Sequence, residues 1–171
     1  YYQLKNLTDY LIDNNLHKDI FISFFDEGDC QPMDEKDNEN WCGGVHNTMF
    51  AIDNNGLIYH CIRFMDSSLQ GEQKPLPIGD IDNGFAILEE HSKNLEMFHS
   101  ITRRSQSTDE CFYCPIAAGC AWCSGYNYQK TGSVDKRVTY ICGMHKARSL
   151  ANVYFWNKVY RHENIDKTFI R

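Results

Sequence analysis

The sequence predicts an α+β fold: a small cysteine-rich metal-binding domain, preceded by a helix and a strand that look like the tail of a βα repeat in a parallel sheet. Three observations lead to this prediction: a helix followed by an apolar strand near the start, an Asn-Gly hairpin, and eight cysteines. The domain is expected to contain the β-hairpin, a loop with clustered cysteines, and helices. The chain has 171 residues and is 42% apolar, so it can bury one sizeable core.

The helix and the strand that resemble the tail of a βα repeat are expected within the first 28 residues. Leucines recur close to helical spacing in residues 3–16, which predicts a helix. The run DIFISFFDE, residues 19–27, is too continuously apolar to be half exposed and predicts a strand buried on both faces. The chain starts without Met inside the predicted helix, so we expect it to be cut from a longer protein.

The remaining elements follow from local patterns. Residues 27–42 are polar and acidic, with the composition of a domain boundary. Two apolar runs flank Asn55-Gly56 and predict a hairpin over 48–61 with a type I′ turn. The remaining expectations are a loop at 66–84 and helices at 85–104 and 144–160.

Charge and composition exclude several classes of partner. The net charge is -6, so the chain lacks the basic surface that nucleic acids or anionic lipids attract. No apolar run approaches the roughly 20 residues that span a bilayer, and the first residues, YYQLKNLTDY, lack the charged-then-apolar order of a signal peptide. We therefore expect a cytoplasmic protein without nucleic-acid or membrane partners.

The cysteines predict a metal site. In a cytoplasmic chain, closely spaced cysteines indicate metal more often than disulfides or inert buried thiols. Zinc and iron-sulfur clusters both take thiolates, and spacing separates them only in part. The number of thiols fits two four-cysteine sites better than one. The eight cysteines are Cys30, Cys42, Cys61, Cys111, Cys114, Cys120, Cys123 and Cys142.

The spacing of seven of these cysteines resembles the SPASM domain. Cys42 is followed by thirteen residues, Gly56, four residues and Cys61; then come Cys111-x2-Cys114-x5-Cys120-x2-Cys123 and a lone Cys142. The family usually has three residues, where this chain has two, within the last clustered pair. SPASM domains extend many radical S-adenosylmethionine (SAM) enzymes and bind two auxiliary [4Fe-4S] clusters. The resemblance implies three regions: the last helix and strand of a partial βα barrel at 1–28, the SPASM domain at 29–160 and a tail at 161–171.

The resemblance also implies a ligand scheme. Cys111, Cys114, Cys120 and Cys142 would hold the second auxiliary cluster. Cys42, Cys61 and Cys123 would hold the first. Cys30 would be its fourth ligand, which would make the cluster an electron carrier; if Cys30 is instead a spare thiol on the linker, one iron stays open to substrate.

The function implied by the resemblance is the maturation of peptides or proteins. Such enzymes install thioether or carbon-carbon crosslinks, or oxidise a sulfatase side chain to formylglycine. The chain has no Cys-x3-Cys-x2-Cys triplet, so S-adenosylmethionine and its cluster are expected only in an N-terminal radical SAM domain of the same polypeptide. The expected partners are that domain and a peptide or protein substrate. The alternative is a zinc-stabilised structural or interaction module without catalysis.

Other residues near the cysteines have less specific signals. His60 and His145 neighbour Cys61 and Cys142, and are expected to hydrogen-bond near a cluster or to be exposed rather than to bind metal. Four arginines could attract an acidic leader peptide or simply solubilise the surface. They are Arg103, Arg104, Arg137 and Arg148.

Overall fold

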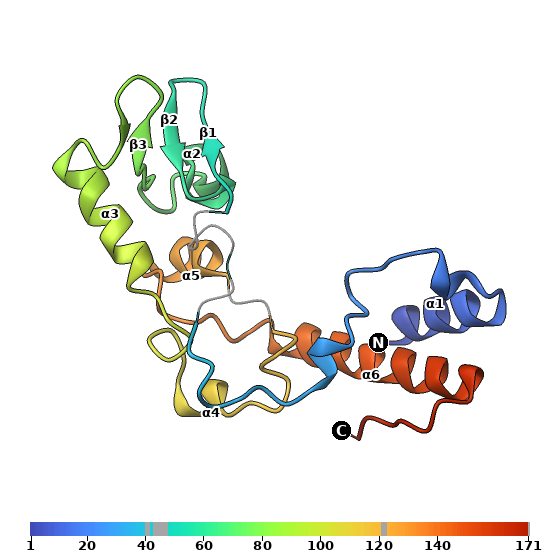
Figure 1. The fold of residues 1–171 in the computed structure, drawn as a ribbon. Coiled ribbons are helices and arrows are strands. Elements are labelled where there is room, and N and C mark those ends of the chain that lie inside the picture. Colours follow the sequence, from blue (N-terminus) through green and yellow to red (C-terminus); the bar gives the residue numbers. More distant parts are fainter. Residues whose placement is uncertain (40–41, 43–47, 121–122, 171) are drawn as a thin grey trace. The chain divides into compact units, whose positions relative to one another are not determined.

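The structure is a computed structural model that describes residues 1–39, 42, 48–120 and 123–170 (Figure 1). It contains helices and a four-stranded antiparallel sheet, so the predicted α+β class is confirmed. The chain forms two compact units. Unit 1 is Tyr1–Asp34, Tyr113–Ala121 and Thr139–Arg171, and unit 2 is Glu35–Phe112 and Trp122–Val138.

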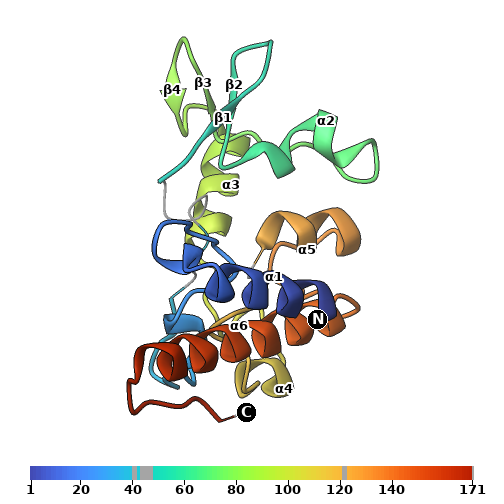
Figure 2. The same cartoon turned by 90° about the vertical axis from the view of Figure 1, so that its right-hand side faces the viewer.

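Unit 1 is built on two helices that lie side by side, α1 (Tyr2–Asp13) and α6 (Cys142–Glu163) (Figures 1 and 2). The rings of Phe25 and Phe155 stack at 4.4 Å between centroids, which joins the segment after α1 to α6. The buried core of the unit is Leu11, Ile12, Phe25, Ala151, Phe155 and Val159. Both helices were predicted, although α1 ends before residue 16 and α6 extends beyond 144–160.

The predicted strand at 19–27 is not formed. A 3-10 helix, η1 (Leu16–Lys18), follows α1, and turns and irregular backbone continue from it. The Ile20 amide donates to the Leu16 carbonyl at 3.0 Å, so the backbone here is satisfied locally. A strand forms only when a second strand takes up its backbone groups, and apolar composition alone does not supply one. Phe21 is consequently 84% exposed.

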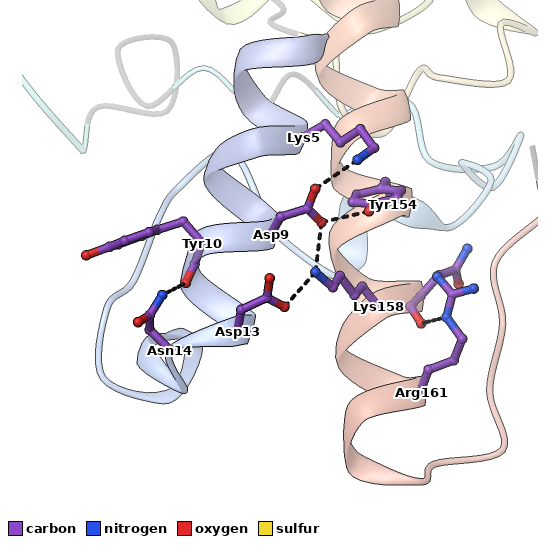
Figure 3. A network of polar contacts seen from close by, with 9 residues as sticks. Lys5, Asp9, Tyr10, Asp13, Asn14, Tyr154, Lys158 and Arg161 are labelled. Carbon is purple, nitrogen blue, oxygen red and sulfur yellow. Dashed lines mark hydrogen bonds and ion pairs between the residues drawn. The ribbon is translucent and has the colours of Figure 1, made fainter.

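A polar network joins the solvent side of α1 to α6 (Figure 3). Asp9 accepts hydrogen bonds from the Lys158 ammonium at 2.8 Å and from the Tyr154 hydroxyl at 2.7 Å. Lys5, one turn before Asp9, donates to the same carboxylate at 2.8 Å. Hydrogen bonds from Lys158, Lys5 and Tyr154 hold the pKa of Asp9 well below its usual range.

This network predicts acid-sensitive stability for unit 1. The pKa of Asp9 is lowered on folding, so its contribution is present above its unfolded pKa of about 3.9 and is lost as the pH falls below it. We expect Asp9→Asn to cost about 1 kcal/mol at pH 7 and to flatten the fall of the melting temperature below about pH 4. Circular dichroism at several pH values measures this. Asp13→Asn, which removes a more exposed partner of Lys158, should change little.

Unit 2 contains the sheet, with strand order β1-β2-β3-β4. Its short strands are β1 (Ala51–Ile52), β2 (Leu57–Tyr59), β3 (Gly79–Asp80) and β4 (Gly84–Phe85). The predicted hairpin is confirmed by β1 and β2, with Ala51 opposite Tyr59. The predicted type I′ turn is wrong, because within residues 53–56 only Gly56 has a positive φ, 80°. The Asp53 amide donates to the Leu57 carbonyl at 3.0 Å, which closes a three-residue loop.

Residues 66–84 are more ordered than the predicted loop. They contain α2 (Asp66–Leu69), β3 and the first residue of β4. The helix expected at 85–104 is the shorter α3 (Glu89–His99), because β4 takes its first residue. Two helices that the sequence did not predict follow, α4 (Asp109–Phe112) and α5 (Ser124–Thr131).

The core of unit 2 joins the sheet to α3. The aromatic rings of Phe98, Phe64 and His60 meet edge to face, at 4.6 Å and 4.3 Å from the Phe98 ring. Cys42 and Cys61 pack on the border of this core. The buried core residues are Ala51, Ile58, Tyr59, Phe64, Ile78, Phe98, Ile101 and Val134. In the described part of the chain, no helix is both long and apolar enough to cross a bilayer.

Candidate metal centre

Two of the predicted ligands in unit 2 begin short helices. Cys61 is the N-cap of the 3-10 helix η3 (Ile62–Phe64), and Cys123 is the N-cap of α5. The Tyr126 amide donates to the Cys123 sulfur at 3.4 Å, and the Arg63 amide donates to the Cys61 sulfur. Amide donors in the first turn of a helix stabilise a thiolate, because they place positive partial charge beside it.

The first turn of α5 lies against η3 because position 125 is glycine. A Cβ on Gly125 would lie 2.6 Å from the Cβ of Arg63, closer than side-chain carbons approach. Gly125 and Arg63 each follow a cysteine by two residues. This close packing therefore sets the separation of the Cys123 and Cys61 segments.

Gly125→Ala should disturb this arrangement. The added methyl group must displace the η3 backbone, and overpacking of this kind costs about 1–3 kcal/mol. Gly143→Ala is the matched control, since Gly143 is also the second residue of a helix and an added Cβ would meet nothing within 4 Å. Chemical denaturation of both variants measures the difference. Equal stability of the two would show that the contact with Arg63 does not constrain the site.

The third member of this group is Cys42. The Cys61 thiol is partly buried, and burial raises its pKa; the negative charges of Cys42 and Cys123 raise the pKa further. Electrostatic influence of this kind means that Cys42 and Cys123 each lie in the neighbourhood of Cys61, although the three cysteines come from three separate parts of the sequence. We call Cys42, Cys61 and Cys123 the unit 2 thiol group.

Three thiols whose charges influence one another are easier to deprotonate with a bound metal cofactor than without one. Each thiolate that forms near another raises the energy of the next, and a bound cation removes this repulsion while it displaces the protons. Cysteine thiolates are also the usual ligands of iron-sulfur clusters and of structural zinc. The chemistry of the unit 2 thiol group therefore fits either cofactor.

The other predicted ligands are distributed over both units. Cys114, Cys120 and Cys142 belong to unit 1, whereas Cys111 lies in α4 of unit 2. The loop from Cys114 to Cys120 consists of two tight turns, since the Ala117 amide donates to the Cys114 carbonyl and the Cys120 amide to the Ala117 carbonyl. Cys142 is the first residue of α6, where the positive end of the helix favours a thiolate.

Arg148 connects this loop to the rest of unit 1. Its guanidinium, on α6, donates to the Gly119 carbonyl and lies 3.4 Å from the Asp29 carboxylate. Asp29 and Gly119 directly precede Cys30 and Cys120. The arginine thus holds both cysteine segments near α6, a positioning role that the sequence did not reveal.

Cys30 belongs to unit 1, whereas the unit 2 thiol group belongs to unit 2. It ends the 3-10 helix η2 (Gly28–Cys30) and is only 4% exposed. Its neighbours in a small apolar cluster are Val153, Tyr160 and Phe169. These contacts are those of a packed core residue rather than of a spare thiol on an exposed linker. Ligation by Cys30 stays a prediction.

Arg103 and the two histidines are more buried than the sequence suggested. Arg103 is 2% exposed; it donates to the Asp37 carbonyl at 2.9 Å and to the Phe112 carbonyl, and its guanidinium lies 4.0 Å from the Phe112 ring centroid. It is therefore a structural residue rather than a surface site for a leader peptide. His60 and His145 are also buried, in units 2 and 1 respectively.

Neither the placement of the described side chains nor a similarity to known proteins identifies a metal site. Over residues 1–39, 42, 48–120 and 123–170, no three His, Cys, Asp or Glu side chains are placed so that they could hold a metal ion. Metal ligation by the eight cysteines stays a prediction. Searches against family models, curated proteins and solved structures found no match to this chain.

Proposed function

We propose that this chain is the auxiliary-cluster region of a radical SAM enzyme that modifies peptide or protein side chains. One observation carries the proposal: the unit 2 thiol group contains the three cysteines, distant in sequence, that the SPASM resemblance assigns to one cluster. Cys123 lies in this group, although Cys120, only three residues earlier, belongs to the other unit. Proximity along the sequence does not explain this separation.

In the proposed role, the protein positions and tunes its cofactors. Clusters of the [4Fe-4S] type supply one-electron transfer when bound, with a potential that depends on hydrogen bonds to sulfur and on burial. Here the amides of Arg63 and Tyr126 donate to two of the sulfurs, and the core of unit 2 shields Cys61. Cys111, Cys114, Cys120 and Cys142 would hold the second cluster.

The wider proposal follows the same resemblance. Residues 1–28, in which the helix α1 forms but the predicted strand does not, would follow the barrel of an N-terminal radical SAM domain in the same polypeptide, where S-adenosylmethionine binds. The substrate would be a peptide or protein in which a crosslink or a formylglycine is formed.

Anaerobic reconstitution with iron and sulfide tests the proposal. We expect about eight irons and eight sulfides per chain, as two four-iron clusters require. Zinc bound tightly without sulfide, under strict exclusion of air, would contradict it and would favour a zinc-stabilised module. Cys30→Ala adds a second measurement: unchanged iron with slightly lower stability would indicate a packing role, whereas an altered cluster spectrum would identify Cys30 as a ligand.

A further inference from the structure

Unit 2 also contains a cavity of about 310 Å³ that the predicted clusters do not use. Two helices end at it: α3, whose C-cap is Ser100, and α5, whose C-cap is Gly132 with a left-handed φ of 74°. Helix C-termini carry partial negative charge, so two of them at one cavity favour a cation there. α5 begins at Cys123, and therefore the cavity and the unit 2 thiol group lie at opposite ends of the same helix.

The hydroxyl groups on the α3 side of the cavity donate their protons elsewhere. Ser100 Oγ donates to the Met97 carbonyl at 2.7 Å. Ser105 Oγ donates to the Thr102 carbonyl at 3.2 Å. A serine hydroxyl has a single proton, so these two groups offer a ligand only oxygen lone pairs.

The hydroxyl groups on the α5 side of the cavity also donate their protons to other groups of the protein. Tyr128 donates its phenolic proton to the Lys74 carbonyl at 2.8 Å, and Ser133 Oγ donates to the Asp135 carboxylate. Asp135 is itself a lining residue and accepts hydrogen bonds without donating any. All the hydroxyl groups named here therefore have only lone pairs to offer a ligand, beside a negative charge.

The remaining lining is apolar. The side chains of Met97, Ile101 and Val134 line the cavity together with the ring of Tyr128. Ligand cavities usually occupy roughly 300–1,000 Å³, so this one has room for a single side chain rather than a larger molecule. A fitting ligand has an unbranched apolar stem and ends in a positively charged hydrogen-bond donor.

We infer that this cavity binds the side chain of a lysine in a peptide. Its ammonium group carries three donors on a flexible four-carbon stem, which matches scattered acceptors around an apolar floor. Asp135 already accepts from Ser133 through Oδ1, which leaves fewer acceptor positions for the bidentate contact that arginine favours. The inference goes beyond the proposed function, since it requires neither iron nor sulfide.

Amide chemical-shift mapping of the intact 15N-labelled chain tests the inference. Nα-acetyl-lysine methylamide and n-butylamine should both give saturable shifts at Ser100, Gly132 and Ser133. Neutral n-butanol should give none of comparable size. Equal shifts with n-butanol, or no saturable shifts at these amides with either amine, would overturn the inference whatever the iron content proves to be.

A matched pair of variants locates the charge that binds the amine. Asp135→Asn should weaken binding by up to about fivefold, because it removes an exposed carboxylate from the lining of the cavity. Asp82→Asn removes an exposed carboxylate of the same unit, in the β3–β4 turn outside the cavity, and should leave binding unchanged. Equal binding by both variants would contradict the proposed site. The dispersion of all other amide signals shows whether each variant is folded.

A further binding experiment distinguishes two ligands that carry an alkylammonium group, a lysine within a peptide and a free polyamine. Binding of the capped lysine at least as tight as that of n-butylamine supports a lysine within a peptide. Binding of 1,5-diaminopentane with exclusion of the capped lysine would assign the cavity to free polyamines and would overturn the lysine assignment.

Discussion

Cys61→Ser is expected to lower the iron content of the anaerobically reconstituted chain from about eight atoms to about four. Cys61 is the member of the unit 2 thiol group whose pKa both of the others raise, and it packs against the core of unit 2. Its loss should therefore remove one whole cluster rather than a single iron. Iron and sulfide analysis, with electron paramagnetic resonance of the reduced protein, measures this result.

Double variants test which cysteines act together. Adding Cys123→Ser to Cys61→Ser should cost no further iron if both residues hold the same cluster, whereas adding Cys142→Ser should remove nearly all of it. If the pair Cys61→Ser and Cys123→Ser lost all iron, Cys123 would belong with Cys120 and Cys142 instead. The grouping of the unit 2 thiols would then have no role in ligation.

Phe98→Ala is expected to destabilise unit 2 by about 3–5 kcal/mol. The Phe98 side chain is fully buried and touches the rings of Phe64 and His60, so its removal leaves a cavity at the centre of the core. Total stabilities of domains are about 5–15 kcal/mol, so this loss is a large fraction. Chemical denaturation measures the change, and metal binding should weaken with it because His60 precedes Cys61.

Phe85→Ala is the control for this prediction. Phe85 lies on the edge strand β4 and is about half exposed, and such changes usually cost about 0.5 kcal/mol. A similar loss in both variants would mean that the aromatic core around Phe98 does not stabilise unit 2 specifically.

Local signals in the sequence predicted those elements that local interactions stabilise. The hairpin at 48–61 follows from two apolar runs around a turn, and the helix around 144–160 from its apolar face. The type of turn in the hairpin, however, depends on hydrogen bonds between a side chain and the backbone. Asp53 accepts amide hydrogen bonds from Asn55 and Leu57 through its side chain, which favours the three-residue loop over the tighter turn.

The strands β3 and β4 could not be predicted in this way. Each has two residues and begins with a glycine, so neither shows an alternating pattern. They form because β2 already offers an edge, where Ile58 pairs with Gly79, and because glycine lets the backbones approach. A Cβ on Gly79 would lie 2.3 Å from the Gly84 carbonyl oxygen.

The eight cysteines and their spacing are determined by the sequence alone, and they sufficed to predict a metal-binding protein with two sites. Only the tertiary structure decided which of them are neighbours. It assigns Cys120 and Cys123 to different units, places Cys42 and Cys123 in the neighbourhood of Cys61, and encloses Cys30 among apolar side chains of unit 1. The physical reason is that spacing constrains residues only over one or two turns of backbone, whereas thiols distant in sequence meet where helices and core pack, as Gly125 does against Arg63.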